Sequence, residues 1–150
     1  MREDQASDFT LADYRALSEF RFQIRRFLRF SEDQARLHGV EPRQHQLLLA
    51  IRGIPAGHKT TVSELAGRLL IRHHSAVELI NRLADHGLVK RQHGDSDHRE
   101  VIVSLTRSGS AVLRKLTEAH REELETLGPK LASTLRSVSR RGRTRRENAA

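Results

Sequence analysis

The 150-residue sequence contains no cysteine, and aromatic residues make up only 4% of it. Without cysteine the chain can form no disulfide bond, no thiolate metal site and no thiol-based redox sensor. Because aromatic residues are few, the core must be built mainly from leucine, isoleucine, valine and alanine. The longest purely apolar run, LLLAI at 47–51, is far too short to cross a membrane. Acidic residues stand where a secretion signal would need an apolar stretch, so the sequence predicts a soluble, cytoplasmic protein of one domain over residues 1–150.

Positive charge is what the chain has in excess, with a formal net charge of +8 at pH 7. Residues 1–41 hold 7 basic and 8 acidic side chains, whereas residues 136–150 hold 6 basic and 1 acidic. A basic protein indicates a polyanionic partner, because each lysine or arginine that neutralises a phosphate releases a condensed counterion. A solvated, disordered terminus explains the same charge equally well, and we expect residues 141–150 to form a basic, flexible tail.

Residues 7–41 predict one long helix, because apolar side chains recur at helical spacing and no proline interrupts them. Ser7, Asp8 or Thr10 could cap its start, and Gly39 is placed to end it. At about thirty residues the helix is longer than the usual range of roughly 8–20. A small lobe of the same chain cannot bury so long a stripe, which favours a homodimer over a monomer whose core the helix covers. The stripe consists of Leu17, Phe20, Ile24, Phe27, Leu28 and Ala35.

The segment 42–106 predicts a compact lobe of three short helices followed by a β-hairpin. The first helix follows Pro42, and the second spans TTVSELAGRLL, with Thr61 or Ser63 as its cap. A four-residue connection leads to SAVELINRLADHGLV, which Gly87 terminates. The runs VKRQH and VIVSL are predicted to be strands on either side of a polar turn, and the second alternates like a half-buried strand. Residues expected inside the lobe are Leu47, Leu48, Ile51, Val62, Leu65, Ala66, Leu69, Ala76, Leu79, Ile80 and Leu83.

Residues 107–140 predict a second pair of helices, the first with Thr106 as its N-cap and the two separated by a break at Gly128-Pro129. The seam of the first helix is Leu113, Leu116, His120, Leu124 and Leu127. The expected fold is therefore mainly α with a small β-hairpin. It comprises a winged helix-turn-helix core at 42–106, flanked by long terminal helices at 7–41 and 107–140 that serve dimerisation.

The third helix of the lobe and the hairpin tip carry the side chains that point to function. A helix with a polar outer face can lie in a DNA major groove, roughly 12 Å wide, and present its first turns to base edges. The hairpin would then be a wing whose Arg99 enters a neighbouring minor groove, held in place by a bidentate bond from Asp97. The outward side chains expected on the helix are His73, His74, Ser75, Glu78, Asn81, Arg82 and Asp85.

The stretch VSELAGRLLIRHHSAVELINRLADHGLVKRQHGDSDHREVIVSLTRSG resembles the signature region of the MarR (multiple antibiotic resistance regulator) family. The likeness covers roughly residues 10–140. Its matching features are the ELA of the first helix, the L-x-x-x-G-L-V that ends the second, and then D-x-R, V-x-L-T and a following glycine. In this chain they are Glu64, Leu65, Ala66, Leu83, Gly87, Leu88, Val89, Asp97, Arg99, Val103, Leu105, Thr106 and Gly109.

The resemblance implies a homodimeric winged-helix regulator of transcription that binds a pseudo-palindromic operator in double-stranded DNA, in many relatives as a repressor released by a small, often aromatic or phenolic ligand. His73, Ser75, Val77 and Glu78 match positions near the start of the family's recognition helix, and Arg99 matches the wing arginine. We expect Lys90 and Arg91 to add phosphate contacts. Two residues depart from the pattern. Arg72 replaces a capping serine or aspartate, and Glu78, an acid, would have to accept from a cytosine amino group or pair with Arg82.

Several other readings are open to the histidines, seven of which lie in 42–106. The pair His73 and His74, and the group of His93, Asp95, Asp97 and His98, could suggest a metal, but solvated positions on a DNA-facing surface fit them better, and we expect no metal site. His120 suits a core or interface position better than a ligand site. An anionic or aromatic effector, if one binds, would be anchored by Arg21, Arg25, His38, His45 and His120.

Two other functions compete with that of a sequence-specific regulator. An enzyme is disfavoured, because no nucleophile elbow, phosphate loop or paired-carboxylate motif is recognisable, and no cofactor is expected. A nonspecific architectural DNA-binding protein that uses the arginine-rich tail is the alternative. Salt dependence and sequence preference would separate it from an operator-specific protein.

Overall fold

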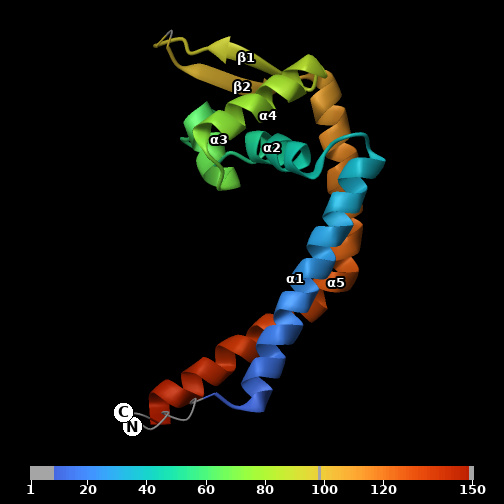
Figure 1. Cartoon of the computed structure of the whole chain (residues 1–150), viewed down its shortest axis with the longest axis vertical. Helices are drawn as coiled ribbons and strands as arrows, with labels where there is room; N and C mark the ends of the chain where they lie inside the picture. Colours follow the sequence, from blue (N-terminus) through green and yellow to red (C-terminus); the bar gives the residue numbers. More distant parts are fainter. Residues whose placement is uncertain (1–8, 98, 149–150) are drawn as a thin grey trace, which may run out of the picture. The chain divides into compact units, whose positions relative to one another are not determined.

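The structure, a computed structural model, describes residues 9–97 and 99–148, except for the side chains of 141–148. Within these residues the chain is mainly helical with one two-stranded antiparallel hairpin, which confirms the expected fold class (Figure 1). No described helix combines the length and apolar character that a bilayer-spanning segment requires. The elements in chain order are α1 (Leu11–Leu37), α2 (Pro42–Arg52), α3 (Val62–Leu69), α4 (His73–Asp85), β1 (Val89–His93), β2 (Val101–Leu105) and α5 (Arg107–Asn148).

The chain divides into two compact units. The lobe unit is residues 31–119, and the helical unit comprises the residues up to Phe30 and those from His120 onward. The lobe unit thus includes the last turns of α1 and the first turns of α5, because Ala35, Val40 and Leu116 are buried together there. Leu88 and Val112 pack against this small cluster.

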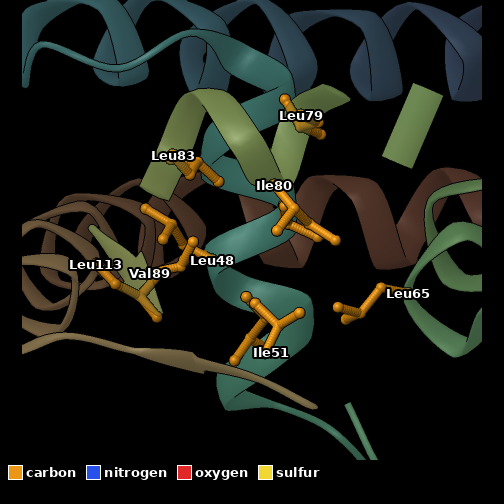
Figure 2. Packing of buried hydrophobic residues seen from close by; sticks show 10 residues of the cluster. Leu48, Ile51, Leu65, Leu79, Ile80, Leu83, Val89 and Leu113 are labelled. Carbon is orange, nitrogen blue, oxygen red and sulfur yellow. The ribbon is translucent and has the colours of Figure 1, made fainter. Parts of the chain in front are cut away.

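The main core of the lobe gathers around α2 (Figure 2). Leu47 and Leu48 of α2 and Leu65 of α3 are fully buried, as the helical spacing predicted. One face of α4 covers them, and Val89 and Val103 close the core from the hairpin. Each fully buried leucine or valine stabilises the lobe by about 1.5–3 kcal/mol relative to its exposed state. The buried face of α4 is Ala76, Leu79, Ile80 and Leu83, as predicted.

Short local signals fix the ends of the lobe's helices. Thr61 caps α3, because its Oγ1 accepts a hydrogen bond from the Glu64 N–H at 3.2 Å. Gly87 follows α4 with a φ of +70°, a left-handed conformation that favours glycine. Thr106 caps α5 by accepting from the Gly109 N–H at 3.0 Å, and its hydroxyl donates to the Gly87 carbonyl at 2.6 Å. All three residues were predicted in these positions.

In the helical unit, α1 and the later part of α5 lie side by side and antiparallel (Figure 1). Glu19 Oε1 lies 3.9 Å from Lys130 Nζ, and further along, the ring of His120 meets Phe27 and Phe30 edge to face. Of the three possible caps of α1, Thr10 is found in this role, since its Oγ1 accepts from the Asp13 N–H at 3.3 Å, while Ser7 and Asp8 lie outside the described residues.

The expected break at Gly128-Pro129 was wrong, because α5 runs continuously through Pro129. A proline inside a helix removes one backbone hydrogen bond and costs about 3 kcal/mol. Here Leu127 before it is buried, and Leu131 after it is half-buried in the helical unit. Packing on both sides therefore outweighs the local penalty. The helix also continues past residue 140, where a flexible tail was expected, to Asn148.

Candidate nucleic-acid interface

The turn between α3 and α4 sets the direction of the helix expected to read DNA. Leu70 adopts the left-handed conformation, with φ 54° and ψ 42°, and its N–H bonds to the end of α3. The Ile71 N–H then donates to the Ala66 carbonyl at 3.0 Å, which closes the turn. α4 begins at His73, and Arg72 at its N-cap makes no side-chain capping bond. The first backbone N–H groups of α4 are thus not satisfied by a capping side chain, an arrangement that suits an anionic oxygen.

The outward face of α4 holds the side chains that the sequence placed there. His73, His74 and Glu78 are exposed, while Val77 and Asn81 are half-buried. Ser75 is also half-buried, and Arg82 and Asp85 are exposed. The helix therefore has one apolar face on the lobe core and one polar face directed away from it.

Of the two partners suggested for Glu78, Arg82 pairs with another residue. Arg82 Nη1 lies 3.8 Å from Glu41 Oε2, so Arg82 contacts the residue that precedes α2. Both side chains are more than half exposed, and such a pair contributes little to stability. Glu78 is therefore an exposed carboxylate on the outer face of α4.

The hairpin forms the wing, and its tip is a closed turn. Val89 pairs with Leu105 and His93 with Val101. Beyond the strands, the Gly94 N–H donates to the Glu100 carbonyl at 2.8 Å. Lys90 and Arg91 are both exposed on β1, and because neighbouring strand residues point to opposite faces, only Arg91 faces α4.

Asp97 positions Arg99 in a different way from the one expected. Its Oδ1 accepts a hydrogen bond from the Arg99 backbone N–H at 2.9 Å, and no bond from the Arg99 guanidinium to Asp97 is present among the described residues. The carboxylate thus shapes the turn, and the exposed guanidinium of Arg99 keeps its donors for another partner. The expected bidentate bond was wrong.

An open groove of about 510 Å³ lies between α4, the start of α3 and the wing. Inside it, Arg91 Nη1 donates a hydrogen bond to Asn81 Oδ1, which joins β1 to α4. Arg91 and Arg99 bring two guanidinium groups to this groove. The groove therefore suits a polyanion that can insert a projecting part between α4 and the wing. The groove is lined by Thr61, Val62, Ser63, His73, Val77, Ile80, Asn81, Arg91, Arg99, Glu100 and Val101.

The loop before α3 fastens the wing, which the sequence did not predict. The Val103 N–H donates to the Thr60 carbonyl at 3.0 Å, and Thr61 bridges to Ile102. Lys59 Nζ lies 3.0 Å from Glu100 Oε2 at the base of the wing tip. These contacts join segments about forty residues apart, and neither a motif nor a periodic pattern marks Lys59 as a partner of Glu100.

The five candidate effector residues are divided between the two units. Arg21 and Arg25 are exposed on α1 in the helical unit. In the lobe unit, His45 is buried at 4% exposure, and His38 Nδ1 lies 2.9 Å from the Gln34 carbonyl oxygen. His120 stacks edge-on against two phenylalanine rings, which favours the packing role. Among the described residues, no group of three or more histidine and carboxylate side chains is arranged to hold a metal ion, and His98 lies outside those residues.

Comparisons with known proteins agree with this geometry. The family model described as "MarR family" matches residues 38–100, which span α2, α3, α4 and β1. A search of curated proteins finds no significant match.

Solved structures with the same fold cover most of the chain. AbsC, a MarR family transcriptional regulator from Streptomyces coelicolor, is 20% identical with a TM-score of 0.68, over 82% of each chain. A mutant MarR from E. coli in complex with operator DNA is 21% identical (TM-score 0.61), over 81% of this chain and 88% of that one. A mutant MepR from S. aureus bound to an oligodeoxyribonucleotide is 19% identical (TM-score 0.62), over 95% and 99%. The lobe therefore matches the MarR family model over residues 38–100, and the chain shares its fold with these MarR family structures.

Proposed function

We propose that the protein is a homodimeric regulator of transcription that binds a pseudo-palindromic operator in double-stranded DNA. The observation that carries the proposal is the groove between α4 and the wing, with Arg91 and Arg99 on its wall and a polar helix face beside it. Related structures of the same fold include one complexed with operator DNA and one bound to an oligodeoxyribonucleotide. A regulator of this kind works in the cytoplasm, where its operator lies.

In this proposal α4 lies in the major groove and the wing reaches the adjacent minor groove. His73, His74, Ser75, Val77 and Glu78 would meet base edges, since the first turns of a recognition helix come closest to them. Arg99 suits the minor groove, where narrow A·T geometry concentrates negative potential. Lys90, Arg82 and the N-terminus of α4 would contact phosphates, which position the protein without reading sequence.

The exposed surface of the helical unit supports the proposal that a second copy of the chain binds there. The number of large apolar side chains exposed along this unit is higher than a monomer of this size normally shows. A partner covering them would hold two lobes at a fixed separation, and half-sites about 34 Å apart, one turn of DNA, would suit the pair. The exposed apolar residues of the helical unit are Phe9, Leu11, Tyr14, Leu17, Phe22, Leu28, Leu124 and Leu135.

Repression and its release follow from the same arrangement. A bound dimer blocks the operator that it occupies. A small aromatic or anionic effector would release it only if that molecule bound more tightly to a dimer whose lobes have the wrong separation for DNA.

Selection of bound sequences from random duplex DNA tests the proposal directly. We expect an inverted repeat with two half-sites, and binding that weakens as salt is raised because phosphate contacts release counterions. Recovery of no preferred sequence, with equal affinity for all duplexes, would instead establish nonspecific architectural binding.

The role of the wing is tested by Arg99→Ala. Loss of the minor-groove guanidinium should reduce operator affinity by roughly 1–3 kcal/mol without affecting the unfolding temperature, because the side chain is exposed. Arg52→Ala is the matched control, since Arg52 is an exposed arginine outside the groove lining. Equal gel-shift affinities for Arg99→Ala and the unmodified protein would contradict the wing assignment.

A further inference from the structure

The hydrogen bond between Arg91 and Asn81 determines which atoms of Asn81 face the groove. Asn81 lies in the third turn of α4, half-buried, and its Oδ1 accepts from Arg91 Nη1 on β1. Both residues line the groove between α4 and the wing. The bond therefore lies where, in the proposed function, the edge of a DNA base would enter the groove.

The chemistry of the pair allows only one orientation of the amide. A guanidinium has five N–H donors and no acceptor, so it can bind the oxygen of an asparagine and not its nitrogen. The bond uses one of the two lone pairs of Oδ1 and turns this oxygen toward β1, while both donors of Nδ2 remain without a partner from Arg91. Within the described part of the chain, Asn81 makes no other side-chain hydrogen bond.

We infer that Asn81 determines sequence specificity by donating from Nδ2 to an acceptor on a base edge, and that Arg91 is the positioning residue that imposes this role. The inference rests on the proposed function. An unconstrained asparagine pairs with adenine through both of its amide atoms. While Arg91 turns Oδ1 toward β1, we expect the Nδ2 donors to lead toward the base edge, so Asn81 favours a base with a suitable acceptor.

The bases differ in what they offer to such a donor. In the major groove guanine presents N7 and O6, adenine N7 and thymine O4 as acceptors, whereas cytosine presents only the N4 amino donor. One position in each half-site should therefore accept guanine, adenine or thymine and exclude cytosine. The same rule predicts a reversal for Asn81→Asp, because a carboxylate accepts only and fits the cytosine amino group.

The test is the same random-duplex selection, carried out with the unmodified protein, Asn81→Asp and Arg91→Ala. The unmodified protein should disfavour cytosine at one half-site position by about tenfold, the discrimination typical of one base contact. Asn81→Asp should enrich cytosine there and leave the other positions unchanged. Arg91→Ala should enrich adenine at that position, because the freed amide can turn and pair through both atoms.

Two matched variants control for charge alone. Gln92→Glu makes the same amide-to-carboxylate change on β1 at an exposed residue outside the groove lining, and Arg52→Ala removes an exposed arginine elsewhere. Neither should alter any position of the selected sequence. The thermal unfolding of every variant is compared first. If Asn81→Asp does not fold, the base selection of Arg91→Ala, whose side chain is exposed, still tests the inference.

The outcomes separate this inference from the proposed function. If the unmodified protein selects an inverted repeat but Asn81→Asp weakens all sequences equally, Asn81 contacts phosphate and the inference is overturned alone. If Arg91→Ala selects the same bases as the unmodified protein, the positioning role of Arg91 is overturned. If the unmodified protein selects no sequence, the proposed function itself fails.

Discussion

At the scale of single residues, backbone contacts decide which substitutions the lobe tolerates. A Cβ added at Gly109 would lie 1.9 Å from the Leu88 carbonyl oxygen, which is backbone and cannot turn aside. Gly109 is also buried, and its N–H donates to the Thr106 cap. The close approach of α5 to the segment before β1 thus needs a residue without a side chain.

Gly109→Ala should therefore destabilise the protein, by on the order of 3 kcal/mol, the upper range for forced overpacking. Gly67→Ala is the matched control, because nothing lies within 4 Å of a Cβ at Gly67 inside α3. That change should stabilise by up to about 1 kcal/mol through helix propensity. Urea unfolding of the two variants gives both values, and a Gly109→Ala protein as stable as the original would refute the close approach.

Leu70 offers a stabilising change. It is 93% exposed and the only non-glycine residue with a positive φ in the described chain. The left-handed conformation costs an L-residue roughly 1–2 kcal/mol, and glycine gives back part of this through its greater freedom in the unfolded chain. Leu70→Gly should stabilise by about 0.5–1 kcal/mol. Leu70→Ala, which keeps the strain, should be close to neutral in the same unfolding measurement.

At the scale of elements, the helices and strands of the lobe could be predicted because their signals are local. The Thr61 cap, the apolar face of α4 and the glycine after it each act within a few residues. Pro129 shows where this fails. Its local penalty was read correctly, but the packing of Leu127 on one side and Leu131 on the other depends on contacts that no local pattern contains.

In the candidate site, too, local features could be predicted from the sequence and contacts between distant segments could not. Most of the residues predicted on the outward face of α4 are exposed, as is Arg99, but Ser75 and Asn81 are half-buried. Sequence reasoning assigned Asp97 the wrong partner, because a backbone N–H two residues away is nearer than a flexible guanidinium. It missed Lys59, whose contact with Glu100 depends on how the loop before α3 meets the wing.

The Lys59–Glu100 pair leads to a prediction about the wing. The side chains are 59% and 25% exposed, so their contact should stabilise the fold by less than about 1 kcal/mol. Glu100 lines the groove, and without Lys59 its carboxylate would repel phosphates. Lys59→Ala should weaken operator binding about threefold to tenfold, and adding Glu100→Gln should restore most of the loss.

Lys115→Ala is the matched control, since Lys115 is an exposed lysine on α5 outside the groove lining. Operator affinities of the single and double variants are compared at one salt concentration, because phosphate contacts depend steeply on salt. A double variant as weak as Lys59→Ala alone would show that Lys59 contacts DNA directly and does not act through Glu100.

At the scale of the whole molecule, charge and apolar surface are divided differently between the units. The residues of the helical unit carry 14 basic and 9 acidic side chains, and those of the lobe unit 13 and 10. The lobe proposed to bind DNA is thus only weakly basic as a whole. Its affinity for a polyanion must come from where its arginines lie, and from two lobes acting together.

In the proposed function, dimerisation is therefore the condition for tight binding, and α1 allows this proposal to be tested. Leu17 and Leu28 are 48% and 47% exposed, and at eleven residues apart they lie on one helix face, about three turns from each other. Leu17→Glu with Leu28→Glu should convert a dimer to a monomer in sedimentation equilibrium, because two carboxylates would have to be buried without partners. Leu49→Glu, at an equally exposed leucine of α2, should leave the mass unchanged.

Operator binding should follow the oligomeric state. Linking two sites raises affinity by roughly 10²–10⁴ over one site alone. The double variant should therefore lose about this factor on a full operator and little on an isolated half-site, while its lobe unfolds at the original denaturant concentration. An unmodified protein that sediments as a monomer at micromolar concentration and still binds the full operator tightly would show that one lobe suffices, and the exposed face of α1 would then need another explanation.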